Sequence, residues 1–171
     1  MRRVRYRVAA SLDGYIAGPN GEADWITMDP EIDFGAIFAQ FDTLLIGRRT
    51  FETMLRGGKA DTPGMKTVVF SQSLRQIDYP NVTIVAEKPK EAVNSIKAES
   101  GKDIWLFGGG VLFRSLLEAG VVDTVEIALM PVLLGEGIPL LASPLKETRL
   151  RRTGQHLYKQ SGIVLLEYAV E

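Results

Sequence analysis

The chain has 171 residues, of which 46% are apolar and 24% are charged, and its formal net charge is −1. This length fits one domain around one core, and the near-zero charge argues against a protein held on nucleic acid by electrostatics. The absence of cysteine and the single histidine exclude disulfides, thiol nucleophiles and Cys/His zinc sites, so we predict no bound metal. No signal peptide and no membrane-length apolar run of ~20 residues occur, and we expect a cytoplasmic protein without a membrane partner.

Strand and helix patterns alternate along the first half of the chain. Basic and apolar residues alternate over 3–10, which is typical of a strand, and we expect the arginines of this segment to face solvent. Apolar residues at helical spacing predict a helix over 34–41. The predicted order is a strand at 3–10, a helix at 34–41, a strand at 43–47, a helix from 48 to about 55, and strands at 67–70 and 82–86.

The second half continues this alternation and ends in a predicted hairpin. Its order is a helix at 89–100, a strand at 104–107, a helix at 111–120, a strand at 123–135 bent by Pro131, and paired strands at 149–158 and 162–170. Strands that alternate with helices indicate an α/β domain with a mostly parallel sheet covered on both faces. We therefore predict one such domain over residues 1–171, with an antiparallel edge supplied by the hairpin.

Glycine or small polar residues follow three of the predicted strands. The segments are "IGRRT" at 46–50, "FSQS" at 70–73 and "FGGGV" at 107–111. Ligands of open α/β sheets bind at the carboxyl ends of strands, where amides at helix N-termini can hold anions. Because neither GxGxxG nor GxxxxGK[ST] occurs, these ends predict a phosphate-rich ligand in another kind of site, with simple tight turns as the alternative.

Two arginines open the helix that follows the first of these glycines. Arg48 and Arg49 oppose the helix dipole, so local electrostatics would not select them, while guanidinium groups suit a phosphate. Thr50 adds a hydroxyl. A bound anion is favoured, and two solvent-facing arginines are the alternative.

Four segments in this order resemble the dihydrofolate reductase-like fold, with helices and a central sheet in three layers. They are "VAASLDGYIAG", "LLIGRRTFETM", "TVVFSQS" and "IWLFGGGVLFRSLLEAGVVDTVEIALMPVLLGEGIPLL". The "SLDGxxA" loop and the segment at 131–140 are most similar to the reductase domain of bifunctional riboflavin-biosynthesis deaminase-reductases. The resemblance covers nearly the whole chain.

This resemblance implies a site for NADPH. In the family, the glycine triplet runs beneath the pyrophosphate and nicotinamide, and its first two residues are joined by a cis peptide. Arg48, Arg49 and Thr50 would hold phosphates, with Arg48 the better candidate for the 2′-phosphate. The implied cofactor residues are Ala10, Ile16, Gly47, Arg48, Arg49, Thr50, Ser71, Gln72, Gly108, Gly109, Gly110 and Val111.

The implied reaction is hydride transfer to a small heterocycle, such as 5-amino-6-(5-phosphoribosylamino)uracil. Arg7 replaces the lysine usual in the riboflavin branch and, with Trp25, is a candidate for substrate contact. Asp13 and Asp33 are candidate proton donors, with a turn residue and a helix cap as the respective alternatives.

Folates and pterins are the alternative substrates. In folate reductases an arginine precedes the third strand, and Met65 stands at that position here, while a strand threonine is replaced at about Ala128. Dihydrofolate is therefore not favoured. A protein that binds NADPH without catalysis, or one that binds no nucleotide, remains a further alternative. The resemblance also implies a homodimer.

Overall fold

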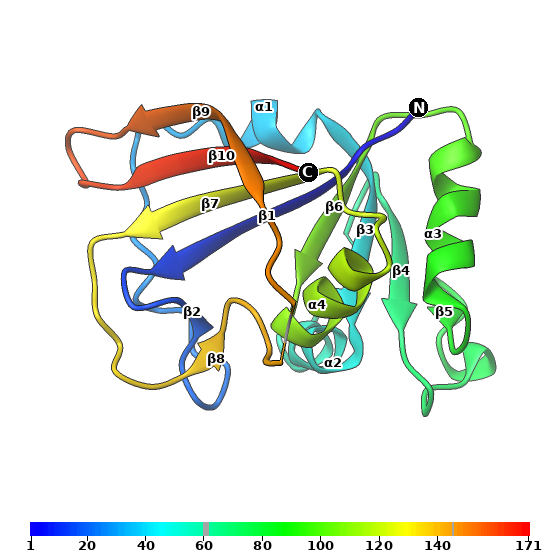
Figure 1. Ribbon diagram of the computed structural model, residues 1–171. Helices are drawn as coiled ribbons and strands as arrows, with labels where there is room; N and C mark the ends of the chain where they lie inside the picture. Colours follow the sequence, from blue (N-terminus) through cyan, green and yellow to red (C-terminus); the bar gives the residue numbers. More distant parts are fainter. Residues whose placement is uncertain (60–61, 145) are drawn as a thin grey trace.

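One eight-stranded sheet runs through the protein (Figure 1). The computed structural model describes residues 1–59, 62–144 and 146–171. Along the sheet the strands follow the order β5, β4, β3, β6, β1, β7, β10, β9. Their bounds are β1 Val4–Ser11, β3 Phe41–Gly47, β4 Lys66–Phe70, β5 Thr83–Val85, β6 Asp103–Gly108, β7 Thr124–Met130, β9 Leu150–Leu157 and β10 Val164–Val170. All neighbours from β5 to β7 are parallel, whereas β10 is antiparallel to β7 and β9. The predicted mostly parallel sheet with an antiparallel hairpin edge is confirmed.

Helices cover both faces of this sheet, as the alternating pattern predicted. On one face, Val93 of α3 (Pro89–Ala98) and Leu116 of α4 (Gly110–Glu118) are buried against the sheet. On the other, Phe51 of α2 (Arg48–Arg56) joins a second buried cluster. The short α1 (Phe34–Phe38) packs Ile37 against that second cluster, and a single 3-10 turn, η1, spans Gln76–Asp78. Helix α1 ends three residues before the predicted 41, because Phe41 already belongs to β3.

A second, two-stranded sheet was not predicted. It pairs β2 (Tyr15–Ala17) with β8 (Ile138–Pro139), antiparallel, beyond the carboxyl end of β1 (Figure 1). Strand β7 ends at Met130, so Pro131 terminates that strand rather than bending it, and the chain then crosses to β8. These segments frame the carboxyl ends of the parallel strands, where the predicted ligand site lies.

Arg5 and Arg7 of β1 do not face solvent, which corrects the sequence interpretation for these two, whereas Arg3, just before the strand, is exposed as expected. Successive side chains of a strand point to opposite faces, and Arg5, Arg7 and Ala9 share one face. The Arg5 side chain is 8% exposed and that of Arg7 15%, because both are covered and paired with Glu126 of the neighbouring β7. The alternating pattern was read correctly as a strand, but this strand is central and has no solvent-facing side.

Candidate active site

A cleft of about 1440 Å³ opens at the carboxyl ends of the parallel strands. The loops after β1, β3, β4 and β6 all reach it, which is the arrangement expected of a ligand site in an open α/β sheet. One half of the cleft is rich in glycine, hydroxyl groups and arginine. Its lining residues are Gly47, Arg48, Arg49, Thr50, Thr53, Phe70, Ser71, Gln72, Ser73, Val85, Ala86, Glu87, Pro89, Gly108, Gly109, Gly110, Val111, Leu112 and Ser115. We call this part the glycine half.

The glycine triplet forms the floor between the two ends of the cleft. The peptide bond between Gly108 and Gly109 is cis, as the family resemblance predicted. Gly108 has a φ of +143°, a conformation that other residues rarely adopt. At Gly110 a Cβ atom would lie 2.5 Å from the carbonyl oxygen of Pro139, so the β8 segment packs directly on this backbone. Helix α4 begins at Gly110 and directs its N-terminal amides to the glycine half of the cleft.

Gly47 is not required by the protein's own packing. Its φ of −81° suits any residue, and a Cβ there would meet Leu112 at 3.7 Å and the Gly108 carbonyl at 3.8 Å, which are ordinary contacts. Gly47 nevertheless lines the cleft at the N-terminus of α2. The absence of a side chain at Gly47 therefore leaves room for a ligand, such as a phosphate group, and is not needed for packing within the protein.

Arg48 is held over the end of β4 by two partners. Its Nε donates to Glu52 at 2.7 Å, one helical turn along α2, and its Nη1 donates to the Ser73 hydroxyl at 2.9 Å. Ser71 in turn accepts hydrogen bonds from the Ser73 and Leu74 amides, which folds the "SQS" turn under the guanidinium. Half of the Arg48 side chain stays exposed, so the group remains accessible to an anion.

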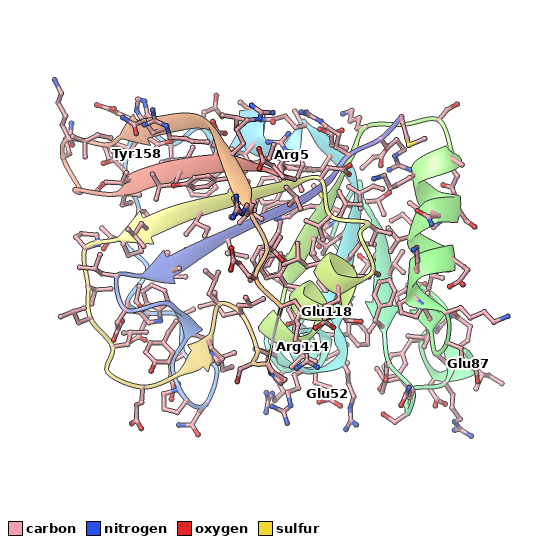
Figure 2. The ribbon with its side chains drawn as sticks, in the orientation of Figure 1. Arg5, Glu52, Glu87, Arg114, Glu118 and Tyr158 are labelled. Atoms are coloured by element: carbon pink, nitrogen blue, oxygen red, sulfur yellow. The ribbon has the colours of Figure 1, made fainter. Side chains whose placement is uncertain are left out.

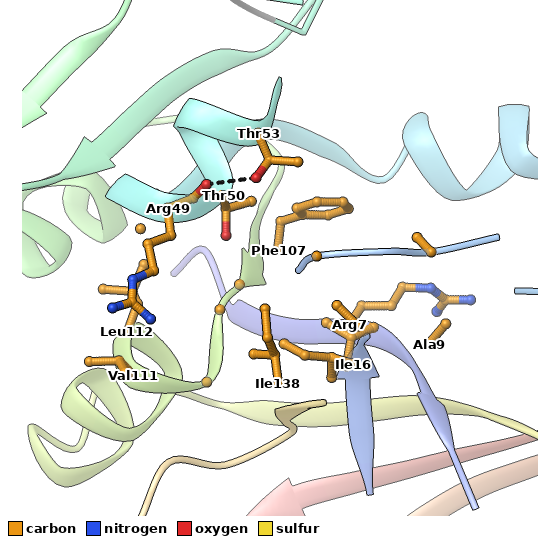
Figure 3. A pocket seen from close by; sticks show the side chains of 18 of the residues that line it. Arg7, Ala9, Ile16, Arg49, Thr50, Thr53, Phe107, Val111, Leu112 and Ile138 are labelled. Atoms are coloured by element: carbon orange, nitrogen blue, oxygen red, sulfur yellow. Dashed lines mark hydrogen bonds between the residues drawn. The ribbon is translucent and has the colours of Figure 1, made fainter. Parts of the chain in front are cut away.

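Arg49 lies beside the start of α4 (Figure 3). Within the described parts of the chain its guanidinium has no hydrogen bond or ion pair, while its backbone carbonyl accepts from Thr53 at 3.0 Å. Figure 3 shows its guanidinium near Val111 and Leu112, at the opposite end of the view from Arg7. The glycine half thus presents two cations and the amides of two helix N-termini to one space.

The other half of the cleft is apolar, and we call it the apolar half. The loop after β2 supplies Ile26, Thr27, Met28 and Ile32, and α1 supplies Phe34, Ile37 and Phe38. The remaining wall residues of this half are Val8, Ala9, Ile16, Trp105, Phe107, Ala128, Met130, Tyr158 and Leu165. Phe107 reaches it because β6 skips one position against β3: Leu45 pairs with Leu106 and Ile46 with Gly108. Tyr158 lies at the end of β9 (Figure 2).

Arg7 is the charged residue at the base of the apolar half. Its Nη1 donates to Glu126 at 2.7 Å, and Glu126 also accepts from the Nε and Nη2 of Arg5 at 2.6 and 2.8 Å. Burial alone would raise the pKa of Glu126, but the hydrogen bonds and charges of Arg5 and Arg7 outweigh it and lower that pKa. The carboxylate is therefore ionised at neutral pH and fixes both guanidinium groups.

The structure brings most of the predicted site residues together. Eleven of the twelve predicted cofactor residues line the cleft, as does Arg7. Ala10 does not, because it is buried and only 1% exposed, and its neighbour Ala9 lines the cleft instead. Trp25 lies outside the lining, where its indole donates to the Glu22 carbonyl at 3.0 Å.

The two candidate proton donors are engaged elsewhere. Asp13 accepts from the amides of Leu134 and Gly135, at 3.1 and 2.7 Å, and it tethers the loop between β7 and β8. Hydrogen bonds from Ser11 and from these amides lower the pKa of Asp13 to about 2. Asp33 caps α1 by accepting from the Ala36 amide at 2.9 Å, which was the alternative reading of this residue. Neither residue lines the cleft.

Several lining residues carried no usable sequence signal. Met28 and Phe34 read as ordinary loop and helix residues, and Tyr158 sits in the distant hairpin. These residues meet at the cleft only because the loop before α1, α1 itself and the β9–β10 turn all fold over the same strand ends. The one usable signal was a mostly apolar segment in a loop, "WITM" at 25–28, which could have indicated the wall of the apolar half.

Comparison with known proteins identifies the family. A family model described as "RibD C-terminal domain" matches residues 2–163. The chain belongs to the RibD C-terminal domain family. It is 34% identical to a Bacillus subtilis protein called "Uncharacterized protein YyaP", over 98% of this chain and 94% of that one. It is 25% identical to the riboflavin biosynthesis protein RibD of Corynebacterium ammoniagenes, over 85% of this chain and 48% of that protein.

Solved structures place this family member in the dihydrofolate reductase-like fold. A Shewanella sp. PV-4 protein with a provisional assignment to riboflavin biosynthesis superposes with a TM-score of 0.83 at 24% identity, covering 100% and 99% of the two chains. Enterococcus faecalis dihydrofolate reductase, complexed with NADP(H) and RAB-propyl, gives 0.68 at 18% identity, with 99% and 96% coverage. A Thermotoga maritima deaminase/5-amino-6-(5-phosphoribosylamino)uracil reductase gives 0.70 at 16% identity, covering 99% of this chain and 57% of that one.

Membrane-spanning helices and clusters of metal-binding side chains are both absent from the described residues. None of their helices is long and apolar enough to cross a membrane. Over the same ranges, no group of three or more histidine, cysteine or acidic residues could hold a metal ion.

Proposed function

We propose that this family member is an NADPH-dependent reductase that transfers hydride to a small heterocycle. The observation that carries the proposal is the continuous cleft: Arg48, fixed to Glu52 and Ser73, stands at one end and the apolar half lies at the other. The glycine floor connects the two. NADPH has a phosphate-bearing adenosine end and an uncharged nicotinamide end, and it therefore matches a cleft that is cationic at one end and apolar at the other.

The residues of the glycine half fit the cofactor. Arg48 would hold the 2′-phosphate against the Ser73 hydroxyl, since a guanidinium can bind a phosphate through two donors. The amides at the start of α4 would hold the pyrophosphate, and Arg49 would add a second positive charge. The Cβ-free face of Gly47 leaves the close approach that such a ligand needs.

The bound cofactor would supply a hydride from the nicotinamide C4, while the protein orients the acceptor and excludes water. The acceptor gains that hydride at an electrophilic carbon and a proton at the adjoining nitrogen or oxygen, and the oxidised cofactor is released. Asp13, with its pKa near 2, is ionised at neutral pH and is a poor proton donor. We infer that the proton comes from water at the mouth of the cleft rather than from Asp13 or Asp33.

Two acceptors meet these requirements. One is the 5-amino-6-(5-phosphoribosylamino)uracil type, which the name of the Thermotoga maritima relative carries. The other is a pterin, related to the substrates of the dihydrofolate reductase fold. Arg7, held by Glu126 at the base of the apolar half, would bind a carbonyl edge of either ring.

Cofactor titrations test the proposal. Binding of NADPH and NADH is followed by nicotinamide fluorescence for the wild type and for Arg48→Ala. We expect the variant to lose at least tenfold in NADPH affinity and less than twofold in NADH affinity, because only NADPH carries the 2′-phosphate. Arg75→Ala, which removes an exposed arginine that pairs with Asp78 outside the cleft, serves as the control.

The outcomes separate the competing functions. Equal loss of both cofactors in Arg48→Ala would move the 2′-phosphate contact elsewhere, and no binding of either cofactor to the wild type would overturn the proposal. Tight NADPH binding without its oxidation by any pterin or aminopyrimidine would identify a non-catalytic binding protein.

A further inference from the structure

The walls of the apolar half distinguish between the two kinds of acceptor. Three of its phenylalanines are left substantially exposed: Phe34 at 39%, Phe38 at 43% and Phe107 at 41%. Trp105 lies between Phe38 and Phe107, with ring centroids 5.4 and 5.5 Å away. In this aromatic row Phe38 and Phe107 are open to the cleft, while Trp105 between them is only 9% exposed. Flat conjugated rings are the ligands that gain most from such a surface.

Most of the charge of the cleft lies in the glycine half. Four charged residues line the whole cleft within the described ranges, and three of them, Arg48, Arg49 and Glu87, belong to the glycine half. Arg7 is thus the one cation available to the apolar half. A phosphate buried there would have to give up its hydration for a single guanidinium, and an anion is costly to bury without several donors.

That guanidinium is already partly compensated. Arg7 and Arg5 share the Glu126 carboxylate, and Arg5 lies a further 3.4 Å from Asp103. Glu126 thus offsets part of the positive charge of Arg7 and fixes the orientation of its guanidinium. Such a group suits a neutral carbonyl oxygen better than a dianion.

We propose that the acceptor is a planar, uncharged conjugated ring with a carbonyl edge and no phosphate group. The ring stacks in the aromatic row formed by Phe38, Trp105 and Phe107, and its carbonyl faces Arg7. This inference rests on the proposed NADPH-dependent reductase function and narrows its substrate. In the reaction, one C=N bond of the acceptor, in the ring of a pterin or in the opened-sugar imine of an aminouracil, takes the hydride at carbon and a proton from water at nitrogen, and NADPH leaves as NADP⁺.

Matched compounds that differ only in a phosphate provide the test. The NADP⁺-saturated protein is titrated, by quenching of tryptophan fluorescence, with 5-amino-6-ribosylaminouracil and its 5′-phosphate, and with dihydroneopterin and its monophosphate. We expect the phosphate-free member of each pair to bind at least tenfold more tightly. Equal or tighter binding of the phosphorylated members would overturn the inference, and so would binding of neither ring.

A variant reports on the same wall. Phe34→Lys places an ammonium group on the exposed edge of the apolar half, and Phe34→Ala is its matched control for the lost ring. We expect Phe34→Lys to reduce the preference for the phosphate-free compound by at least fivefold relative to Phe34→Ala, and an unchanged preference would count against the inference. Failure of NADP⁺ itself to bind would instead reject the proposed function, and the inference with it.

Discussion

Two glycines of the cleft are needed for different reasons, and the difference can be measured. Gly110 packs against the β8 backbone, whereas Gly47 has an ordinary φ and room for a Cβ atom. We therefore expect Gly110→Ala to destabilise the fold by about 1–3 kcal/mol, since a rigid backbone must shift. Gly47→Ala should leave the fold unchanged or stabilise it by about 0.4–1 kcal/mol while weakening NADPH at least tenfold. Urea unfolding and fluorescence titration together check both results.

A result that would contradict this account is easily stated. If Gly47→Ala bound NADPH as well as the wild type, the cofactor would not approach the chain at this turn. If both variants lost the same stability, the distinction between packing and ligand space would be wrong.

Glu126 controls stability in acid as well as the orientation of Arg7. Its pKa is lowered in the folded protein, so its stabilisation is complete above the unfolded pKa of about 4.3 and is lost as the pH falls through the lower folded value. We expect Glu126→Gln to cost about 3 kcal/mol at pH 7, because two buried guanidinium groups lose their anion. The difference from the wild type should shrink below pH 4 in denaturant unfolding. Glu118→Gln, at an exposed position on α4, is the control.

The residue scale also shows what the sequence could predict. The glycine triplet, Arg48 and the "SQS" turn are contiguous motifs, and motif order was enough to assign them to one site. Arg5 could not be recognised as buried, since a strand with alternating arginines looks alike at an edge and at a centre. Only the pairing of β1 with β7 supplies Glu126 as its partner.

At the scale of elements, the loop between β2 and α1 is held in place by Asp29. One carboxylate oxygen accepts from the Ser161 amide in the β9–β10 turn at 3.0 Å, and the other accepts from the Glu31 amide at 2.9 Å. These hydrogen bonds, led by Ser161, lower the pKa of Asp29. The same loop and turn contribute Met28 and Tyr158 to the cleft, so Asp29 joins two walls of the apolar half.

Asp29→Asn tests that role. We expect the acceptor KM to rise about tenfold, with NADPH affinity within twofold of the wild type, because the glycine half does not touch this loop. Asp24→Asn, on the same loop but exposed, should change neither value. A loss of NADPH affinity equal to the rise in KM would show a global rather than a local effect. Since the pKa of Asp29 is lowered, its hydrogen bonds to the Ser161 and Glu31 amides should also weaken as the pH falls through the pKa of Asp29 in the folded protein.

The sequence predicted helices and strands correctly where a regular pattern of apolar residues continues over many positions. It failed where a strand forms only by pairing with a segment distant in the sequence. The hairpin at β9 and β10 and the helices α3 and α4 have strong patterns of their own. The β2–β8 pair has three and two residues, joins segments more than 120 positions apart, and has no local signature. The skipped position at Phe107 is likewise set by the register between β3 and β6.

At the scale of the whole molecule, the cleft is lined from both ends of the chain. A ligand that spans it contacts elements from β1 to the hairpin and should stabilise the fold as a unit. At a concentration 100 times its Kd, NADPH should add about 2.7 kcal/mol, which corresponds to a Tm rise of roughly 5–10 °C for a chain of this size. Thermal unfolding with and without NADPH measures this rise, and an unchanged Tm at saturation would contradict it.

The homodimer implied by the family resemblance stays a prediction. Sedimentation equilibrium should give twice the chain mass of 18.8 kDa if it holds. The chain mass itself would reject it.

The central claim is that this cleft transfers hydride from NADPH to a neutral heterocycle, and a labelled cofactor tests it most directly. The protein is mixed with NADPH that carries deuterium at the transferring C4 position and with a phosphate-free pterin or aminouracil, and the product is analysed by mass spectrometry. The account predicts one deuterium on a carbon of the reduced acceptor for each NADPH oxidised. Stable NADPH in every such mixture, or oxidation with no deuterium in the product, would contradict it.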